Sequence, residues 1–280
     1  MKKTFLLFAA SAMCILMQAQ VLEIVSMQKV ANPQGMEAPI VAGISPKGDY
    51  LLLTSDVNSG LIRYDIATGE LNTISKADGA GWAVKISADG QNIVYRELYY
   101  DTNKLARHNV IEYNLASNDK AVVAKAQRDM TTLVHANNAN SVTINEDLYM
   151  VLVHNGKNII LTPNGQQHAY NWASISPDGS KILYYVSGVG CFVCDIYGQG
   201  VRKIASHCRA PQWYDNNTII GMADEDDGKY ITASSIVVYT LDGKHQILVD
   251  KHMVAMYPYA ADGKVAFSTA AGEVYILQVK

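Results

Sequence analysis

The sequence predicts an all-β protein, a six-bladed β-propeller whose blades are antiparallel sheets of four strands. Three observations support this fold. A short motif recurs at intervals of about 43 residues. A second strand–turn–strand pattern follows five of the six copies, and the last copy is one strand short while a spare strand lies near the N-terminus. No segment between strands keeps the 3.6-residue apolar period of a helix, which disfavours an α/β arrangement.

The recurring motif is a tight turn followed by an apolar strand. Its clearest copies are ISPKGDYLLLTS from Ile44, ISADGQNIVYRE from Ile86 and ISPDGSKILYYV from Ile175. Weaker copies are TINEDLYMVLV from Thr143, WYDNNTIIGM from Trp213 and YAADGKVAFST from Tyr259. Four copies have a glycine at the same turn position, namely Gly48, Gly90, Gly179 and Gly263. This repeat length is that of a four-stranded propeller blade.

A hairpin pattern follows the motif in five repeats. Each hairpin alternates apolar and polar residues on both sides of a turn that contains Gly, Asn or Asp. The segments begin at Leu61, Val110, Asn158, Cys191 and Ile236. We therefore expect one strand before the motif's turn, a second after it, and a third and fourth on either side of the later turn.

The final repeat provides only three strands, over residues 254–259, 264–268 and 273–279. Residues 21–27 alternate apolar and polar side chains and could supply the fourth. Pairing of the two ends would close the ring and remove exposed sheet edges. A seven-bladed ring is the alternative if residues 101–140 contain a further unit.

The composition limits the kind of partner. The chain has 280 residues, of which 49% are hydrophobic and 18% charged, which excludes a disordered or collagenous protein. Its formal net charge of −3 argues against nucleic acid, which would require a basic surface.

The first residues have the features of a secretory signal peptide. Lys2 and Lys3 precede an apolar run over residues 5–17, and Ala19 fits a cleavage site. We expect residues 1–19 to be removed and residues 20–280 to form a single propeller domain. Cys14 suggests lipidation as an alternative, but the residues before it do not match a lipobox. No later stretch has the length of a transmembrane helix, so we expect a soluble periplasmic or secreted protein and not an integral membrane protein.

Two segments carry a resemblance to a known family. Ser176-Pro177-Asp178-Gly179 with the strand that follows it, and residues 62–69 with the pattern IxxxDxxxG, resemble the propeller repeat of the TolB family and its WD-like relatives. The resemblance implies a propeller of the bacterial envelope that binds other proteins.

TolB proteins also carry an α/β domain before the propeller, and 280 residues leave no room for it, so contacts that require that domain are not carried over. Similar repeats accompany serine oligopeptidases and occur in some polysaccharide lyases. A GxSxG nucleophile motif is absent from this sequence.

Two residues near the start of innermost strands are candidates for ligand contact. Trp82 and Asn171 each lie four residues before the isoleucine that opens the motif. Aromatic rings at a channel mouth can stack on sugars or peptides. Core packing accounts for Trp213, which replaces that isoleucine in its own repeat.

Two histidines lie just before innermost strands, His168 and His207, and we take them as binding candidates at a channel mouth. The seven histidines show no HxH or HExxH spacing. We therefore predict no metal site and no cofactor.

Four acidic residues, Asp224, Glu225, Asp226 and Asp227, crowd into the connection between the second and third strands of the fifth blade. Ca²⁺ would relieve their repulsion, but the EF-hand pattern is absent, so a solvated acidic loop is the simpler interpretation. These residues are further binding candidates.

The equivalent connection of the second blade is long and aromatic. It spans residues 97–109 and includes the candidates Tyr99 and Tyr100. Such connections share one face of a propeller, and we expect that face to be acidic and suited to a basic protein partner.

The three cysteines of the mature chain allow several interpretations. Cys191 and Cys194 form a CxxC motif inside an expected strand, where positions i and i+3 point to opposite faces. Zinc knuckles instead place this motif at a tight turn. We expect buried thiols. A disulfide from Cys208 to one of the other two and a metal site with His207 are the alternatives, and an odd number of cysteines argues against a disulfide framework.

The expected function is a non-enzymatic binding or scaffold module of the periplasm or cell envelope, with an envelope protein as partner. A peptide or a carbohydrate is a further ligand class. One alternative is a carbohydrate-active propeller, a lyase or hydrolase, that uses His168, His207 and acidic residues at one mouth. Another is a sensor or accessory subunit of an envelope complex. No residue is assigned a catalytic role.

Overall fold

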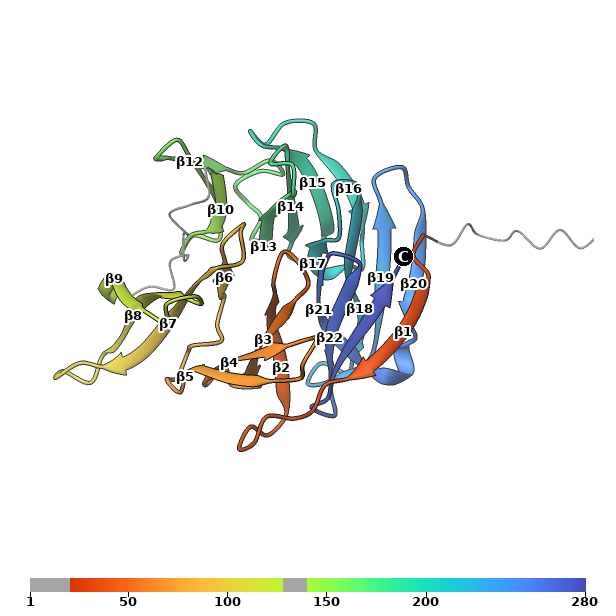
Figure 1. Cartoon of the computed structure of the whole chain (residues 1–280). Helices are drawn as coiled ribbons and strands as arrows, with labels where there is room; N and C mark the ends of the chain where they lie inside the picture. The colour runs from red at the N-terminus through yellow and green to blue at the C-terminus, as the bar shows by residue number, and fades with distance from the viewer. Residues whose placement is uncertain (1–20, 128–139) are drawn as a thin grey trace, which may run out of the picture.

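The structure is a computed structural model that describes residues 21–127 and 140–280. Six antiparallel sheets follow one another around the molecule, and the one helical element is a single 3-10 turn, η1 (Lys251–Met253), among the described residues (Figure 1). This arrangement confirms the six-bladed propeller. The expected signal peptide, residues 1–19, lies outside the described residues.

The sheets occur in chain order. Blade one contains β2 (Pro39–Ile44), β3 (Tyr50–Ser55), β4 (Leu61–Asp65) and β5 (Leu71–Ser75). Blade two contains β6 (Lys85–Ile86), β7 (Asn92–Tyr100), β8 (Ala106–Asn114) and β9 (Lys120–Gln127). Blade three contains β10 (Asn140–Ile144), β11 (Met150–His154) and β12 (Lys157–Leu161).

Blade four contains β13 (Tyr170–Ile175), β14 (Lys181–Val186), β15 (Gly190–Asp195) and β16 (Arg202–Ala205). Blade five contains β17 (Arg209–Trp213), β18 (Thr218–Asp226), β19 (Ile231–Thr240) and β20 (His245–Val249). Blade six contains β21 (Ala255–Ala261), β22 (Lys264–Thr269), β23 (Val274–Val279) and the N-terminal β1 (Ile24–Lys29).

The motif turns are held by a short side-chain network. Ser176 Oγ donates to Asp178 Oδ1 at 2.6 Å and accepts from the backbone N–H of Lys181 at 2.9 Å. Asp178 Oδ1 also accepts from the N–H of Ser180. Gly179 has a φ of +75°, which favours glycine at this position. The motif thus fixes the turn from innermost to second strand and carries no chemistry of its own.

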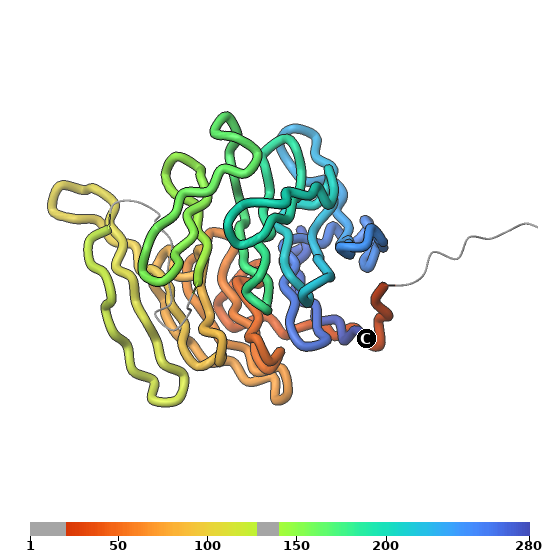
Figure 2. The backbone as a smooth tube through the Cα atoms, turned by 90° about the horizontal axis from the view of Figure 1, so that it is seen from above, coloured from red at the N-terminus to blue at the C-terminus, as the bar shows by residue number. Residues whose placement is uncertain are grey.

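The two ends of the described chain close the ring. β1 pairs antiparallel with β23, and the backbone N–H of Glu23 donates to the Lys280 carbonyl at 2.8 Å. Figure 2 shows the N-terminal segment meeting the C-terminal strand. The Gln246 side chain of blade five accepts hydrogen bonds from the backbone N–H groups of Val21 and Leu22. The predicted closure by the N-terminal strand is therefore confirmed.

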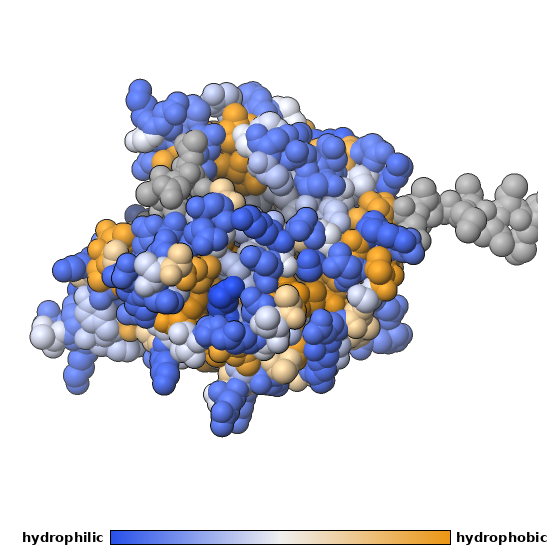
Figure 3. Space-filling view, viewed as in Figure 1, coloured by the Kyte–Doolittle hydropathy of each residue, from blue (hydrophilic) through white to orange (hydrophobic). Residues whose placement is uncertain are grey.

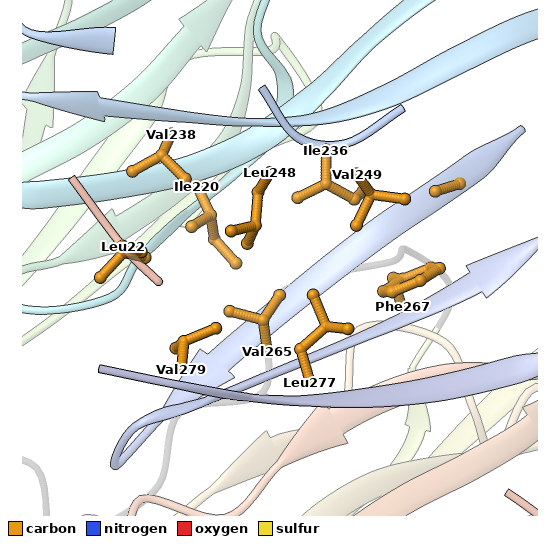
Figure 4. Close-up of a cluster of buried hydrophobic side chains, with 11 residues drawn as sticks. Leu22, Ile220, Ile236, Val238, Leu248, Val249, Val265, Phe267, Leu277 and Val279 are labelled. Atoms are coloured by element: carbon orange, nitrogen blue, oxygen red, sulfur yellow. The ribbon is translucent and has the colours of Figure 1, made fainter. Parts of the chain in front are cut away.

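The core consists of separate apolar clusters between neighbouring blades. Figure 4 shows the cluster between blades five and six, where Leu22 packs with side chains that include Leu248 and Leu277. Equivalent clusters join blades one and two, three and four, four and five, and six and one. Within the described parts of the chain, no such cluster joins blade two to blade three.

Blade three differs from the prediction because the described segment after β12 forms turns and not a fourth strand. Pro163 has no N–H to give to a sheet. The backbone N–H of Asn164 donates to the Tyr170 hydroxyl at 2.9 Å, and that hydroxyl donates to the Gly165 carbonyl at 3.0 Å. A buried tyrosine therefore satisfies backbone groups that a strand would have paired.

Two predicted connections are largely strand. β7 and β8 pair as far as Tyr100 and Ala106, so the long aromatic connection of blade two is an extended hairpin. In blade five, Asp224, Glu225 and Asp226 end β18 and pair with β19. Continued antiparallel pairing satisfies the backbone groups of these residues better than a loop would.

The outer surface shown in Figure 3 is largely hydrophilic, with apolar patches, one of them over β1. Ile24, Val25 and Met27 of this strand are exposed. In the part of the chain that the structure describes, no helix has the length and apolar character needed to cross a membrane.

Candidate functional site

A polar pocket of about 560 Å³ lies where blades four and five meet. Its walls come from the start of β13, the end of β14, the segment that opens β17 and the end of β18. In each blade the innermost strand begins beside the end of the second strand, because the two are antiparallel, and these strand ends lie on the same side of the propeller. The side chains at these strand ends therefore converge at one mouth of the central channel. The pocket is lined by Asn171, Trp172, Tyr185, Ser187, Gly188, His207, Arg209, Asp224 and Asp226.

An ion pair between Arg209 and Asp224 forms the charged centre of the pocket. Arg209 Nη1 donates to Asp224 Oδ2. The Asp224 side chain is only 4% exposed, whereas that of Arg209 is 40% exposed. The guanidinium therefore binds a buried carboxylate at one end and presents further N–H donors to the pocket.

Two aromatic rings form the adjoining wall. Trp172 is 37% exposed and meets the Tyr185 ring edge-on, with the ring centroids 5.5 Å apart. The guanidinium carbon of Arg209 lies 6.0 Å from the Trp172 ring centroid. Burial raises the pKa of Tyr185, and Arg209 offsets part of this rise. The tyrosine is thus a neutral hydroxyl at physiological pH, beside a cation and an exposed ring.

The backbone at Trp172 takes an unusual conformation. Its φ is +49°, in the left-handed region that bulky residues rarely adopt, and it lies in a bulge of the β13–β14 pairing. Ala210 of β17 and Tyr257 of β21 have φ values of +45° and +51° in matching bulges. Bulges of this kind redirect side chains, and in blade four the bulge carries the tryptophan that lines the pocket.

The remaining polar wall is fixed by a hydrogen bond between strands. Asn171 Nδ2 donates to Ser187 Oγ at 2.7 Å. The pairing places Asn171 opposite Tyr185, so one register positions both residues.

Four of the candidates from the sequence meet in this pocket, namely Asn171, His207, Asp224 and Asp226. The other six do not line it. Trp82 is exposed in the turn before β6, and His168 lies in the turn before β13. Tyr99 and Tyr100 lie on the β7–β8 hairpin.

Glu225 and Asp227 have partners outside the pocket. Glu225 pairs with Lys251 at 3.4 Å, and Asp227 Oδ1 accepts the backbone N–H groups of Lys229 and Tyr230. Since Arg209 neutralises Asp224 as well, the acidic segment of blade five is less charged than its sequence indicates.

Sequence reasoning missed Arg209 and Tyr185. Arg209 lies four residues before Trp213, the same offset that relates Asn171 to Ile175, so the repeat alignment contains a signal for it. Tyr185 carries no such signal, because its role depends on contact with Trp172 and Arg209 from other strands.

Within the described residues the three cysteines, Cys191, Cys194 and Cys208, are buried thiols. Cys191 and Cys194 belong to different apolar clusters, on opposite faces of β15, so this CxxC is not a zinc knuckle. Among the described residues, no group of three or more His, Cys, Asp or Glu side chains could hold a metal ion.

The fold and the pocket together define a six-bladed propeller with a polar site at one mouth. The fold is that of TolB-type propellers. A putative TolB from Agrobacterium tumefaciens aligns with a TM-score of 0.59 and 16% identity, over 89% of this chain and 91% of that one.

TolB from Acinetobacter baumannii aligns with a TM-score of 0.58 and 15% identity, over 78% of this chain and 55% of that one. An oligogalacturonate lyase in complex with manganese aligns with a TM-score of 0.52 and 17% identity, over 85% and 76% of the two chains. No family model matches the sequence. No curated protein matches it either. At these identities the likeness concerns the fold.

Proposed function

We propose that this protein is an exported, non-enzymatic binding propeller of the bacterial periplasm or cell envelope, and that it binds a segment of an envelope protein in the pocket between blades four and five. The observation that carries the proposal is the convergence of Trp172, Tyr185, Arg209 and Asp224 around a cavity of about 560 Å³. A cavity of this size suits a few side chains of a peptide.

The chemistry of the pocket supports a protein ligand. Trp172 offers an exposed ring for an apolar or planar group, and Arg209 offers donors for a carboxylate or a backbone carbonyl. Asp226, exposed at the rim, can accept from a basic or amide group. Exposed aromatic and arginine side chains of this kind are the residues that contribute most to protein interfaces.

Export is supported by the sequence of residues 1–19. Fractionation of expressing cells, followed by mass spectrometry of the intact protein, tests it. We expect an envelope or secreted protein that begins at Gln20. A cytoplasmic protein that keeps Met1 would contradict this part of the proposal.

The binding function is tested by capture and reconstitution. Wild-type protein, Trp172→Ala and Arg209→Ala are immobilised and exposed to envelope extract, and each captured protein is purified and titrated by calorimetry. We expect at least tenfold weaker binding by both variants. Tyr100→Ala, on the exposed hairpin of blade two, is the matched control. Equal binding by all four proteins would exclude this pocket.

A carbohydrate-active enzyme is the second candidate. His207 and Tyr185 place an imidazole and a phenol in the pocket that also holds the Arg209 cation, and the propeller shares its fold with an oligogalacturonate lyase. A lyase would generate a double bond in the sugar product, which ultraviolet absorbance detects. Activity on oligogalacturonate that His207→Ala abolishes would favour the enzyme over the binding module.

A further inference from the structure

Two thiols from neighbouring blades lie together beneath the pocket. Cys191 is the second residue of β15 in blade four, and Cys208 immediately precedes β17 in blade five. Both side chains are fully buried and belong to the one cluster that joins these blades. Burial is the main cause that raises the pKa of Cys191, and the neighbouring Cys208 side chain adds to the rise.

The sulfurs occupy a confined position. A Cβ added at Gly221 of β18 would lie 2.4 Å from Cys208 Sγ, so this sulfur packs directly on the strand backbone. Tyr185 and Tyr239 pack against the apolar cluster that contains both cysteines. The thiol pair therefore lies between the pocket wall and the third strand of blade five.

The third thiol is held apart from this pair. Cys194 lies three residues beyond Cys191 on β15, and its side chain belongs to the cluster between blades three and four. Burial, as the main cause, raises its pKa to about 12. Its position on the other face of the strand excludes it as a partner for Cys208.

We propose that Cys191 and Cys208 form a disulfide between blades four and five when the chain folds in the presence of a disulfide oxidant such as glutathione disulfide. The Cys208 thiolate attacks one sulfur of the oxidant and expels a glutathione thiolate. The Cys191 thiolate then attacks Cys208 Sγ and expels the glutathione bound there. Two protein thiols are oxidised, one glutathione disulfide is reduced to two thiols, and these take up the two protons.

Burial of both thiols determines when during folding the disulfide can form. In the folded, reduced protein both thiols are inaccessible and Cys191 is held protonated, so it is a poor nucleophile. The bond therefore forms while the blades assemble, and once buried it resists reduction.

The position of the bond ties it to the pocket. Cys208 lies between His207 and Arg209, which both line the cavity. A covalent bond to β15 would hold this segment in place and close a loop over residues 191–208, which restricts the unfolded chain. The inference does not depend on the proposed binding function.

The test is refolding of the full chain with and without glutathione disulfide, followed by alkylation and tryptic mapping. We expect the oxidised sample to lose about 2 Da and to contain one cross-linked pair of peptides, residues 182–202 joined to residues 204–209. Because the first peptide holds two cysteines, fragmentation of the pair must locate the bond at Cys191. A bond at Cys194, or full alkylation of Cys208, would overturn the proposal.

Variants provide the matched comparison. Cys194→Ser should keep the cross-link, whereas Cys191→Ser should lose it. The oxidised wild-type chain should unfold at a higher urea concentration than the reduced chain, and Cys208→Ser should remove that difference. Equal unfolding midpoints for the oxidised and reduced wild-type chains would contradict the proposed constraint between the blades. Mapping of the wild-type chain decides the proposal even if a variant fails to fold.

Discussion

Arg209 links the interior of blade five to the solvent in the pocket. Its partner Asp224 is almost inaccessible, so this carboxylate has lost its water and depends on the guanidinium for compensation. The same guanidinium approaches the Trp172 ring, which keeps an exposed aromatic side chain next to a fixed positive charge. One residue thus serves both the stability of the blade and the chemistry of the site.

Replacement of Arg209 by alanine should therefore destabilise the protein and also remove the positive charge from the pocket. Leaving Asp224 without its partner should lower the free energy of unfolding by about 1–3 kcal/mol. Urea denaturation measures this change. Lys244→Ala is the control, because the Lys244–Asp242 pair is solvent-exposed and should contribute little. Equal effects of the two substitutions would show that burial of Asp224 is unimportant.

The hydrogen bonds in the motif turn of blade four affect the protonation of Asp178. The hydroxyl of Ser176 is the main reason that the pKa of Asp178 lies well below its ordinary value of 3.8, followed by the N–H of Ser180. Because the folded pKa is depressed, this carboxylate stabilises the fold above about pH 4, and the contribution is lost as pH falls below that value.

Ser176→Ala should raise the Asp178 pKa toward 3.8, and a carboxyl NMR titration reads it directly. Ser180→Ala should raise it less, since the side-chain bond of Ser180 is a smaller cause. An unchanged titration in Ser176→Ala would show that the hydroxyl does not hold the charged form.

At the scale of strands and turns, the sequence predicted most of the fold. The SPDG-type turns of blades one, two and four mark the innermost and second strands because the Ser and Asp side chains satisfy the turn locally. The prediction of a fourth strand in blade three was wrong. The backbone N–H of Asn164 in this segment donates to the Tyr170 hydroxyl from the next blade, and the sequence of blade three alone does not show that contact. The pocket was predicted only in part for the same reason. His207 and Asp224 lie in recognisable positions, whereas Tyr185 acquires its role from strands that meet only in the folded molecule.

Gly221 of β18 packs tightly against the segment that opens β17, so a larger residue at this position should be destabilising. Gly221→Ala would place a methyl group 2.4 Å from Cys208 Sγ and 3.1 Å from the Arg209 carbonyl. We expect a loss of about 1–3 kcal/mol in the free energy of unfolding, because this part of the core has no space. The double variant Gly221→Ala with Cys208→Ala should recover part of the loss. Failure to recover any of it would assign the strain to the backbone instead.

At the scale of the whole molecule, stability depends on contacts between blades. Each apolar cluster joins two neighbouring sheets, and the cluster between blades five and six includes Leu22, which precedes β1. The closing segment therefore contributes backbone pairs to blade six and a buried side chain to the junction with blade five.

Leu22→Ala should consequently destabilise the entire ring. Loss of this buried side chain should cost about 2–4 kcal/mol in the free energy of unfolding, as measured by urea denaturation. Val25→Ala on the neighbouring strand removes an exposed side chain and should have almost no effect. Similar midpoints for Leu22→Ala and the wild type would mean that the junction does not depend on the closing segment.

The pairing of β1 with β23 also sets an order of events during synthesis. Lys29 leaves the ribosome early, while its partner Tyr275 follows only after blades one to five have been translated. At about 5–20 residues per second, the first strand waits roughly 10–50 s for its neighbour. Throughout that interval its apolar side chains and free backbone groups are accessible to chaperones, and the ring closes only after β23 has been translated.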